Sequence, residues 1–399
     1  MAITKNIPLA LSAIAVNGSD DIHLVDTRTS SSASASCSSQ HQQRRLPLLP
    51  SEKNTTLISE PTKYFPEQIK RIVDAADAIS PDAINLPEDN PYPVIDISPW
   101  LNPSTSTEED KQNVINQVLT EATSTGSFNI VGHGIGEDVF DNLYASSHRF
   151  FSMSLEEKMQ FSSAEETTLN GYVAQGIESS GIASDNPKEK LDLKELFTMS
   201  YPPNNDNNVR GPEEFHNAMS QYMEQLQSAE VALQKIFTAA LSMAKGIDLS
   251  TNHLRDVEED ARGMLRAFRY PHMPGFEDAT KLKPHSDLGT ITIIASDTEE
   301  GLEEIRDGRW YRVPMGNGEL HVAVGEVLSM WSNGLFQNNI HRVSKEAKKD
   351  RLSFPYFVSQ GKQSNGPGIS PICSSEEMPI FPRVSPKTHV MKYFEQYKI

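Results

Sequence analysis

The sequence predicts an α+β protein with a mainly β core, built as a β-sandwich or jelly-roll barrel on a helical layer. Amphipathic helical patterns all lie before residue 246. Beyond it the chain changes to short runs rich in β-branched and aromatic residues, separated by turns such as Asp307-Gly308. Helices followed by many short strands are typical of a helical layer packed on a sandwich or barrel.

The first 62 residues lack sustained periodicity and are rich in Ser, Thr, Gln and Asn. This composition predicts a disordered leader, and its serine-rich, arginine-containing stretch leaves a targeting role open as the alternative. Residues 63–91 are expected to form a short helix over Phe65–Ala78 and a linker punctuated by prolines.

Residues 92–210 are predicted to form an N-terminal region of alternating strands and helices. The expected elements are a strand over Pro93–Ile97, a helix over Asp110–Thr123, a strand over Gly126–Val131, and helices over Glu137–Phe151 and from Leu155. The remaining segment, 162–210, is rich in Gly, Asn and Pro, which predicts an irregular loop over a site.

Residues 211–399 are predicted to contain one long supporting helix and the β core. The helix runs over Pro212–Lys245, ends before Gly246, and carries an apolar stripe of the kind that packs in a core. The expected strands after it are Met264–Tyr270, Thr290–Ile294, Trp310–Val313, His321–Val324, Val327–Trp331 and Leu352–Val358.

Composition excludes several classes of protein. The formal net charge of −18 disfavours nucleic acid as a partner, and no apolar run is long enough to span a membrane. Cys37 and Cys373 exclude a disulfide framework and a cysteine-based zinc site. We expect a monomer, and a reducing compartment, the cytoplasm, unless the leader directs the chain to an organelle.

Two histidines and one aspartate are candidates for a metal site. His285 and Asp287 are two residues apart, so on a strand end their side chains share a face, and His341 can join them from a distant strand. Two imidazoles and one carboxylate on one face of an octahedron leave three positions open. That set is characteristic of non-haem Fe(II) oxygen chemistry.

The open positions suit a 2-oxo acid and O₂, and the far carboxylate of the acid needs a cationic partner. Arg351 can bind a carboxylate through two parallel hydrogen bonds. Ser353 follows two residues later on the same strand face and can add a hydroxyl.

Taken together, the chain from about Pro93 to Phe357 resembles the iron(II)/2-oxoglutarate-dependent dioxygenase family, in the branch that includes isopenicillin N synthase and the plant hormone and flavonoid oxygenases. The matching segments are Pro93-Val94-Ile95-Asp96, Phe128 to Gly134, Phe150-Phe151 to Lys158, Leu265-Arg266 to Pro271, His285 to Thr290, Trp331 to Gly334, His341-Arg342-Val343 and Arg351-Leu352-Ser353.

This resemblance implies a double-stranded β-helix core that holds Fe(II) with His285, Asp287 and His341. It also implies that the far carboxylate of 2-oxoglutarate is bound by Arg351 and Ser353 with help from the hydroxyl of Tyr270. The expected activity is oxidation of a small organic molecule by hydroxylation, desaturation or ring closure, with succinate and CO₂ as co-products and no catalytic side chain beyond the metal centre.

One position departs from the family pattern. Many plant members carry Asn two residues before the tyrosine, where this chain has Phe268. Isopenicillin N synthase uses the same Arg and Ser to hold its peptide substrate, so an oxidase that consumes no 2-oxoglutarate remains the alternative. Asp287-Leu288-Gly289-Thr290 resembles the 2-oxoglutarate users and favours them. A non-catalytic, cupin-like binding protein is a more remote alternative.

Four further residues are candidates for substrate contact: Arg266, Arg269, Tyr172 and Phe336. For the arginines the competing interpretation is a structural ion pair, and for Phe336 it is core packing. His133, His272 and His321 are expected to be structural or exposed to solvent. The acidic run of Glu299, Glu300, Glu303 and Glu304 is expected to form a solvated surface.

Overall fold

The computed structural model describes residues 76, 79–80, 82–87, 91–162, 170–177, 192–200, 211–257, 263–272, 282–297, 301–343, 349–358 and 370–389. All of them belong to one contact unit, residues 58–399. Some predicted segments lie outside the described residues. They are the leader 1–62, the helix over Phe65–Ala78 except Ala76, and much of 162–210. The predicted boundary between the N-terminal region 92–210 and the region 211–399 stays a prediction.

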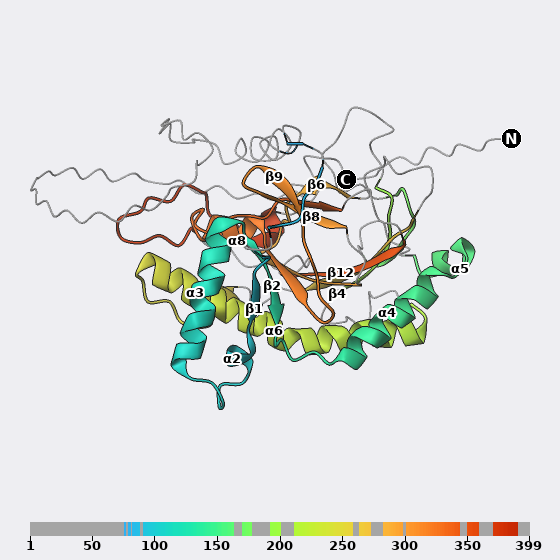
Figure 1. Ribbon diagram of the computed structural model, residues 1–399, viewed down its shortest axis with the longest axis horizontal. Coiled ribbons are helices and arrows are strands. Elements are labelled where there is room, and N and C mark those ends of the chain that lie inside the picture. Colours follow the sequence, from blue (N-terminus) through green and yellow to red (C-terminus); the bar gives the residue numbers. More distant parts are fainter. Residues whose placement is uncertain are drawn as a thin grey trace, which may run out of the picture. The chain divides into compact units, whose positions relative to one another are not determined.

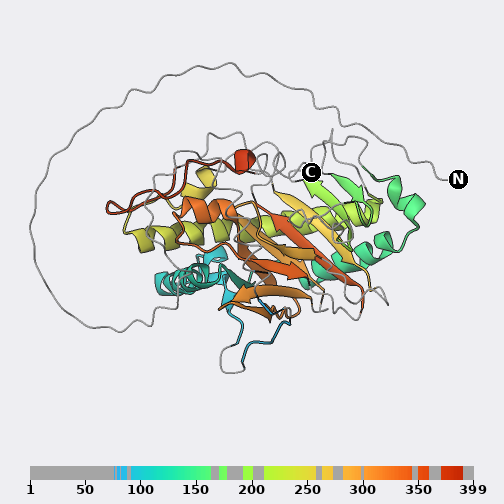
Figure 2. The same ribbon diagram turned by 90° about the horizontal axis from the view of Figure 1, so that it is seen from above.

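Two β-sheets form the core (Figures 1 and 2). The larger has eight strands in the order β1-β2-β10-β7-β12-β5-β4-β3, and the smaller has four in the order β6-β11-β8-β9. The strands are β1 (Val94–Asp96), β2 (Ser127–Val131), β3 (Gly171–Val173), β4 (Glu195–Ser200), β5 (Met264–Tyr270), β6 (Leu282–His285), β7 (Ile291–Ser296), β8 (Leu302–Arg306), β9 (Arg309–Arg312), β10 (Leu320–Val324), β11 (His341–Val343) and β12 (Arg351–Phe357). The predicted fold, a mainly β jelly-roll core with a helical layer, is confirmed.

The helices lie mainly on one side of the larger sheet. They are α2 (Ser98–Leu101), α3 (Glu108–Ser124), α4 (Glu137–Phe151), α5 (Leu155–Met159), α6 (Glu213–Lys245), α7 (His253–Val257) and α8 (Glu326–Trp331). A capping box between Thr107 and Asp110 starts α3, and Gly246, at φ 62°, ends the 33-residue α6. Among these helices none is long and apolar enough to cross a membrane.

Each strand of the larger sheet presents opposite faces to two different environments, because successive side chains alternate. The outer face is mostly apolar and packs on the helical layer, as where the ring of Phe128 lies 6.2 Å from that of Phe237 on α6. On the inner face, residues of the larger sheet meet residues of the smaller one in a separate cluster formed by Leu196, Phe268, Tyr270, Leu282 and Val343. The space between the sheets is therefore where inward side chains meet.

Two local predictions were wrong. Val327–Trp331 was predicted as a strand, but it forms most of α8, in which every residue is buried. A short run that is apolar on all sides carries no periodicity to separate strand from helix. The segment 162–210 was predicted as irregular, yet its described parts include β3 and β4.

The prediction that the acidic run forms a solvated surface was also wrong for its described residues. Glu303 and Glu304 lie in β8 and are 3% and 0% exposed, instead of forming a solvated surface. Each has a charged partner, Arg342 for Glu303 and Arg306 for Glu304, which makes burial tolerable. Glu299 and Glu300 lie outside the described residues.

Candidate active site

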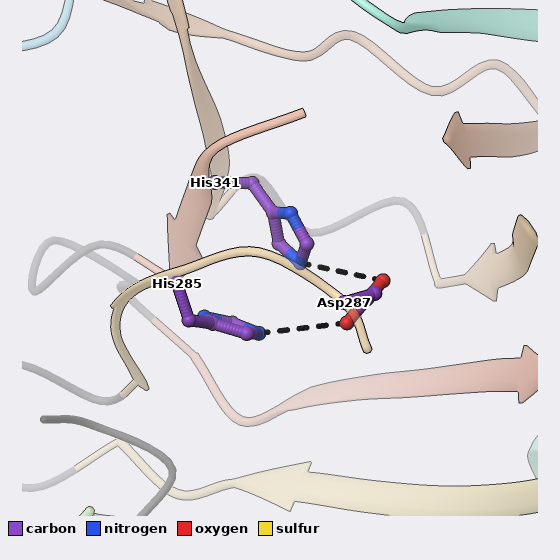
Figure 3. A group of neighbouring side chains, drawn as sticks. All are labelled: His285, Asp287 and His341. Atoms are coloured by element: carbon purple, nitrogen blue, oxygen red, sulfur yellow. Dashed lines mark ion pairs between the residues drawn. The ribbon is translucent and has the colours of Figure 1, made fainter. Parts of the chain in front are cut away.

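The three predicted metal ligands come together at the edge of the smaller sheet. His285 ends β6, His341 begins β11, and the two residues are directly opposite in the β6–β11 pair. The Nε2 atom of His285 is 3.8 Å from Oδ1 of Asp287, and that of His341 is 3.9 Å from Oδ2. Figure 3 shows both rings directed at the carboxylate. One ligand atom from each residue lies within 4.8 Å of the others, so a single ion can contact all three.

The protonation and partners of these residues fit a divalent metal. The Nδ1–H of His285 donates to the carbonyl of Lys283 at 2.8 Å, which leaves its Nε2 lone pair for the ion. Burial lowers the pKa of His285 to about 4 and also lowers that of His341, so both rings are neutral at pH 7. Asp287 is 5% exposed, and its Oδ2 has no hydrogen-bond partner among the described residues. A buried, unsatisfied carboxylate oxygen between two neutral imidazoles suits Fe(II).

The loop that carries Asp287 is held against the start of α8 by backbone hydrogen bonds. The N–H of Glu326 donates to the carbonyl of Asp287 at 2.8 Å, and that of Val327 to Gly289 at 3.0 Å. This approach requires glycine at position 325, because a Cβ there would lie 2.3 Å from the carbonyl oxygen of Gly289. The carboxylate is thereby positioned by rigid secondary structure and not by the loop alone.

A buried guanidinium lies on the inner face of the larger sheet. Arg351, 1% exposed, is directly opposite Tyr270 in the β5–β12 pair, with its guanidinium carbon 5.5 Å from the ring centroid. Ser353 follows on the same face, opposite Phe268 on one side and Ser296 on the other. Burial lowers the pKa of Arg351, whereas the nearby Tyr270 and Asp297 raise it.

Two segments of the chain match known families. Residues 92–221 match the family described as non-haem dioxygenase in morphine synthesis N-terminal, and residues 261–360, which carry the metal-ligand cluster and Arg351, match the 2OG-Fe(II) oxygenase superfamily. The chain belongs to the 2OG-Fe(II) oxygenase superfamily. It is an Fe(II)- and 2-oxoglutarate-dependent oxygenase, as the resemblance predicted.

Curated relatives span most of this oxygenase. Feruloyl CoA ortho-hydroxylase 2 of Arabidopsis thaliana is 25% identical over 313 residues, 77% of this chain and 80% of the relative. Clavatol oxidase claD of Penicillium crustosum is 27% identical over 296 residues, 66% of this chain and 84% of the relative. The crystal structure of a full-length Neurospora crassa protein in complex with alpha-KG shares the fold, with a TM-score of 0.64 and 20% identity over 79% of this chain and 99% of that one.

Two of the four predicted substrate residues of the oxygenase, Arg266 and Arg269, lie on opposite faces of β5 in the larger sheet. Arg266 is half-buried and shares the inner face with Phe268 and Tyr270. Arg269 lies on the outer face in ion pairs with Glu195 (2.7 Å) and Asp350 (2.6 Å), the structural role that competed with a substrate role.

The other two candidates also have core contacts. Tyr172 donates its hydroxyl to Glu195 at 2.5 Å and packs edge-on against Phe150. Phe336 is fully buried against Phe237 of α6, which agrees with the core-packing interpretation. Of the four, only Arg266 is placed to face the space between the sheets.

Two of the three other histidines considered from the sequence, His133 and His321, have structural surroundings. His133 contacts the carbonyl of Gly318 at 2.7 Å through Nε2. His321 is buried, and its Nδ1–H donates to Oδ1 of Asn129 at 3.1 Å. The backbone N–H of His272 donates to Asp350. His321 is thus a satisfied histidine and His272 is exposed to solvent, which are the two outcomes expected for this pair.

Two buried charged groups beside the site were not predicted to lie there from the sequence. Lys194 precedes β4 and pairs with Asp192 at 3.0 Å, and both side chains are almost completely buried. Glu304 lies opposite His341 in the β8–β11 pair and accepts from Asn339 at 3.1 Å. Period-two alternation with Leu196 could have placed Lys194 on the inner face, but nothing local distinguishes Glu304 from a surface glutamate.

Proposed function

We propose that the oxygenase binds Fe(II) through His285, Asp287 and His341, and that Arg351 and Ser353, assisted by Tyr270, bind the far carboxylate of 2-oxoglutarate. The convergence of three donor atoms within 4.8 Å carries this proposal. Support for the second part comes from the buried guanidinium of Arg351 and the hydroxyl of Ser353, which share the inner face of the larger sheet.

Bound Fe(II), 2-oxoglutarate and O₂ supply the chemistry, an oxidation of a C–H bond with succinate and CO₂ as co-products. The protein holds the ion with two neutral imidazoles and one carboxylate, which leaves three coordination positions for the cosubstrates. A bidentate hydrogen bond from the guanidinium fixes the orientation of the 2-oxo acid. Burial of Arg351 strengthens that contact by excluding water.

The substrate is proposed to be a small organic molecule of specialised metabolism. Support comes from the curated relatives, whose names include a feruloyl CoA ortho-hydroxylase and a clavatol oxidase. Arg266 is the proposed contact for a carboxylate on the substrate, because its side chain shares the inner face with Phe268 and Tyr270. The proposed outcome is hydroxylation, desaturation or oxidative cyclisation.

Anaerobic titration with Fe(II) and then 2-oxoglutarate tests the assignment. A weak visible charge-transfer band is expected in the wild type and absent in His341→Ala, since the chelate needs the complete ligand set. In Arg351→Ala the band should require a much higher 2-oxoglutarate concentration. Iron binding without a band at any 2-oxoglutarate concentration would contradict the cosubstrate assignment, and failure to bind iron would contradict the metal assignment.

A further inference from the structure

The last described residue of the chain, His389, is fully buried far along the sequence from the predicted ligands. Its Nε2–H donates to Oε2 of Glu326 at 2.7 Å. Glu326 begins α8 and is itself 3% exposed. A charged carboxylate removed from water in this way depends on each hydrogen bond that it accepts.

The same Glu326 contacts the loop between the metal ligands in two ways. Its other carboxylate oxygen, Oε1, accepts from the hydroxyl of Ser286 at 2.5 Å. Its backbone N–H donates to the carbonyl of Asp287 at 2.8 Å. Since Ser286 lies between His285 and Asp287, a shift of Glu326 moves the segment from which two of the three ligands project.

Residues 370–389 are hydrogen-bonded to α8 and to the turn that follows it. The N–H of Ile372 donates to the carbonyl of Trp331 at 2.7 Å, and the indole N–H of Trp331 donates to the carbonyl of Val384 at 3.0 Å. The N–H of Ile380 donates to Oδ1 of Asn333 at 2.8 Å. The C-terminal segment and the metal-ligand loop therefore both depend on the position of α8.

We propose that His389 is a positioning residue for the metal centre, acting through Glu326 on Ser286 and the backbone of Asp287. Without His389, a buried oxygen of Glu326 loses a charge-assisted hydrogen bond, so the carboxylate moves toward another donor or toward water. The hydroxyl of Ser286 then loses the carboxylate oxygen to which it donates, and the loop that carries Asp287 becomes free to shift. Groups that orient metal ligands in this indirect way typically contribute about 10–100-fold to metal affinity.

Variants of His389 test this with Co(II) as a spectroscopic probe and with hydrogen exchange of the metal-free protein. His389→Ala should weaken Co(II) binding by about 10-fold, alter the Co(II) ligand-field spectrum, and accelerate exchange in residues 285–290. His389→Gln keeps an N–H donor and should restore most of the affinity. Ser286→Ala breaks the relay at its other end and should change the same readouts, which keeps the test usable if His389→Ala does not fold.

The matched control is Ile372→Ala, which truncates a buried side chain in the same C-terminal segment but outside the relay. It should lower thermal stability while leaving the Co(II) affinity within about two-fold of wild type. Co(II) affinity and loop exchange that are unchanged in His389→Ala would overturn the proposal. An equal loss of affinity in Ile372→Ala would also overturn it, because general loosening of the segment would then explain the effect.

Discussion

His341 lies directly across the β6–β11 pair from His285, with their ring centroids 4.3 Å apart. Strand register therefore sets the distance between two proposed ligands that are remote in sequence. A slip of one residue would turn one ring to the opposite face of the sheet and dismantle the cluster. The proposed metal site is for this reason a property of the sheet and not only of the motif.

Replacement of His341 by alanine should remove the metal site without unfolding the protein. Loss of a direct ligand should reduce Co(II) affinity by more than the roughly 100-fold upper range of indirect effects. Isothermal titration with Co(II) measures this, and His148→Ala, an exposed histidine on α4, is the control. Comparable Co(II) affinity in the two variants would rule out His341 as a ligand.

Arg351→Lys should weaken 2-oxoglutarate binding while leaving the metal site intact. An ammonium keeps the charge but not the planar pair of donors, and losing one charge-assisted hydrogen bond costs about 1.5–3 kcal/mol, or roughly 10–150-fold in KM for 2-oxoglutarate. The measurement is the 2-oxoglutarate dependence of succinate formation, with the Co(II) affinity as a check. Arg309→Lys, exposed on β9, should leave both values unchanged. An unaltered KM in Arg351→Lys would remove Arg351 from the cosubstrate site.

Gly325→Ala should damage the metal site through the backbone. The added Cβ would lie 2.3 Å from the carbonyl oxygen of Gly289, which has no side-chain freedom to move away. Overpacking of this kind costs about 1–3 kcal/mol of unfolding free energy, and the displaced loop should also weaken Co(II) binding. Gly316→Ala is the control, because the atoms nearest to its Cβ belong to the flexible side chain of Glu319, which can move away. Urea denaturation measures the unfolding free energy of both variants, and titration measures their Co(II) affinity. Values for Gly325→Ala equal to those for Gly316→Ala would show that the loop is not displaced.

His321 should make the protein less stable in mild acid. Burial lowers the pKa of His321 from 6.5 to about 4, so the unfolded chain takes up a proton before the folded protein does. The free energy of unfolding should therefore be unaffected by this group above pH 6.5 and fall as the pH drops below it. Integrated from pH 7.5 to 5.0, this single group accounts for about 2 kcal/mol.

The control for that effect is His321→Asn, whose amide can still donate toward Asn129 but does not titrate. Urea denaturation of both proteins at the two pH values should show a smaller loss of stability in the variant. Equal losses would mean that His321 is not the group responsible.

Much of the fold was readable from local pattern. The period of apolar residues placed α3, α4 and α6 close to their observed bounds, and the alternating runs placed β5, β9, β10 and β12. The three-residue strand β3 was not recognised, because its surroundings are rich in Gly, Asn and Pro, whereas the equally short β1 was placed by its apolar residues. Buried α8 was mistaken for a strand because its apolar residues face core on every side.

By itself the sequence determined the chemistry: which imidazoles, carboxylate and guanidinium are available, and that Arg266 and Arg269 must face opposite sides of one strand. Only the tertiary structure decided which side is the site, and it assigned Arg266 to the inner face and Arg269 to ion pairs on the outer one. The same holds for buried Glu304 and for the relay from His389 to Ser286. Periodicity relates neighbours along a strand, whereas burial and contact depend on which distant strands and helices pack against it.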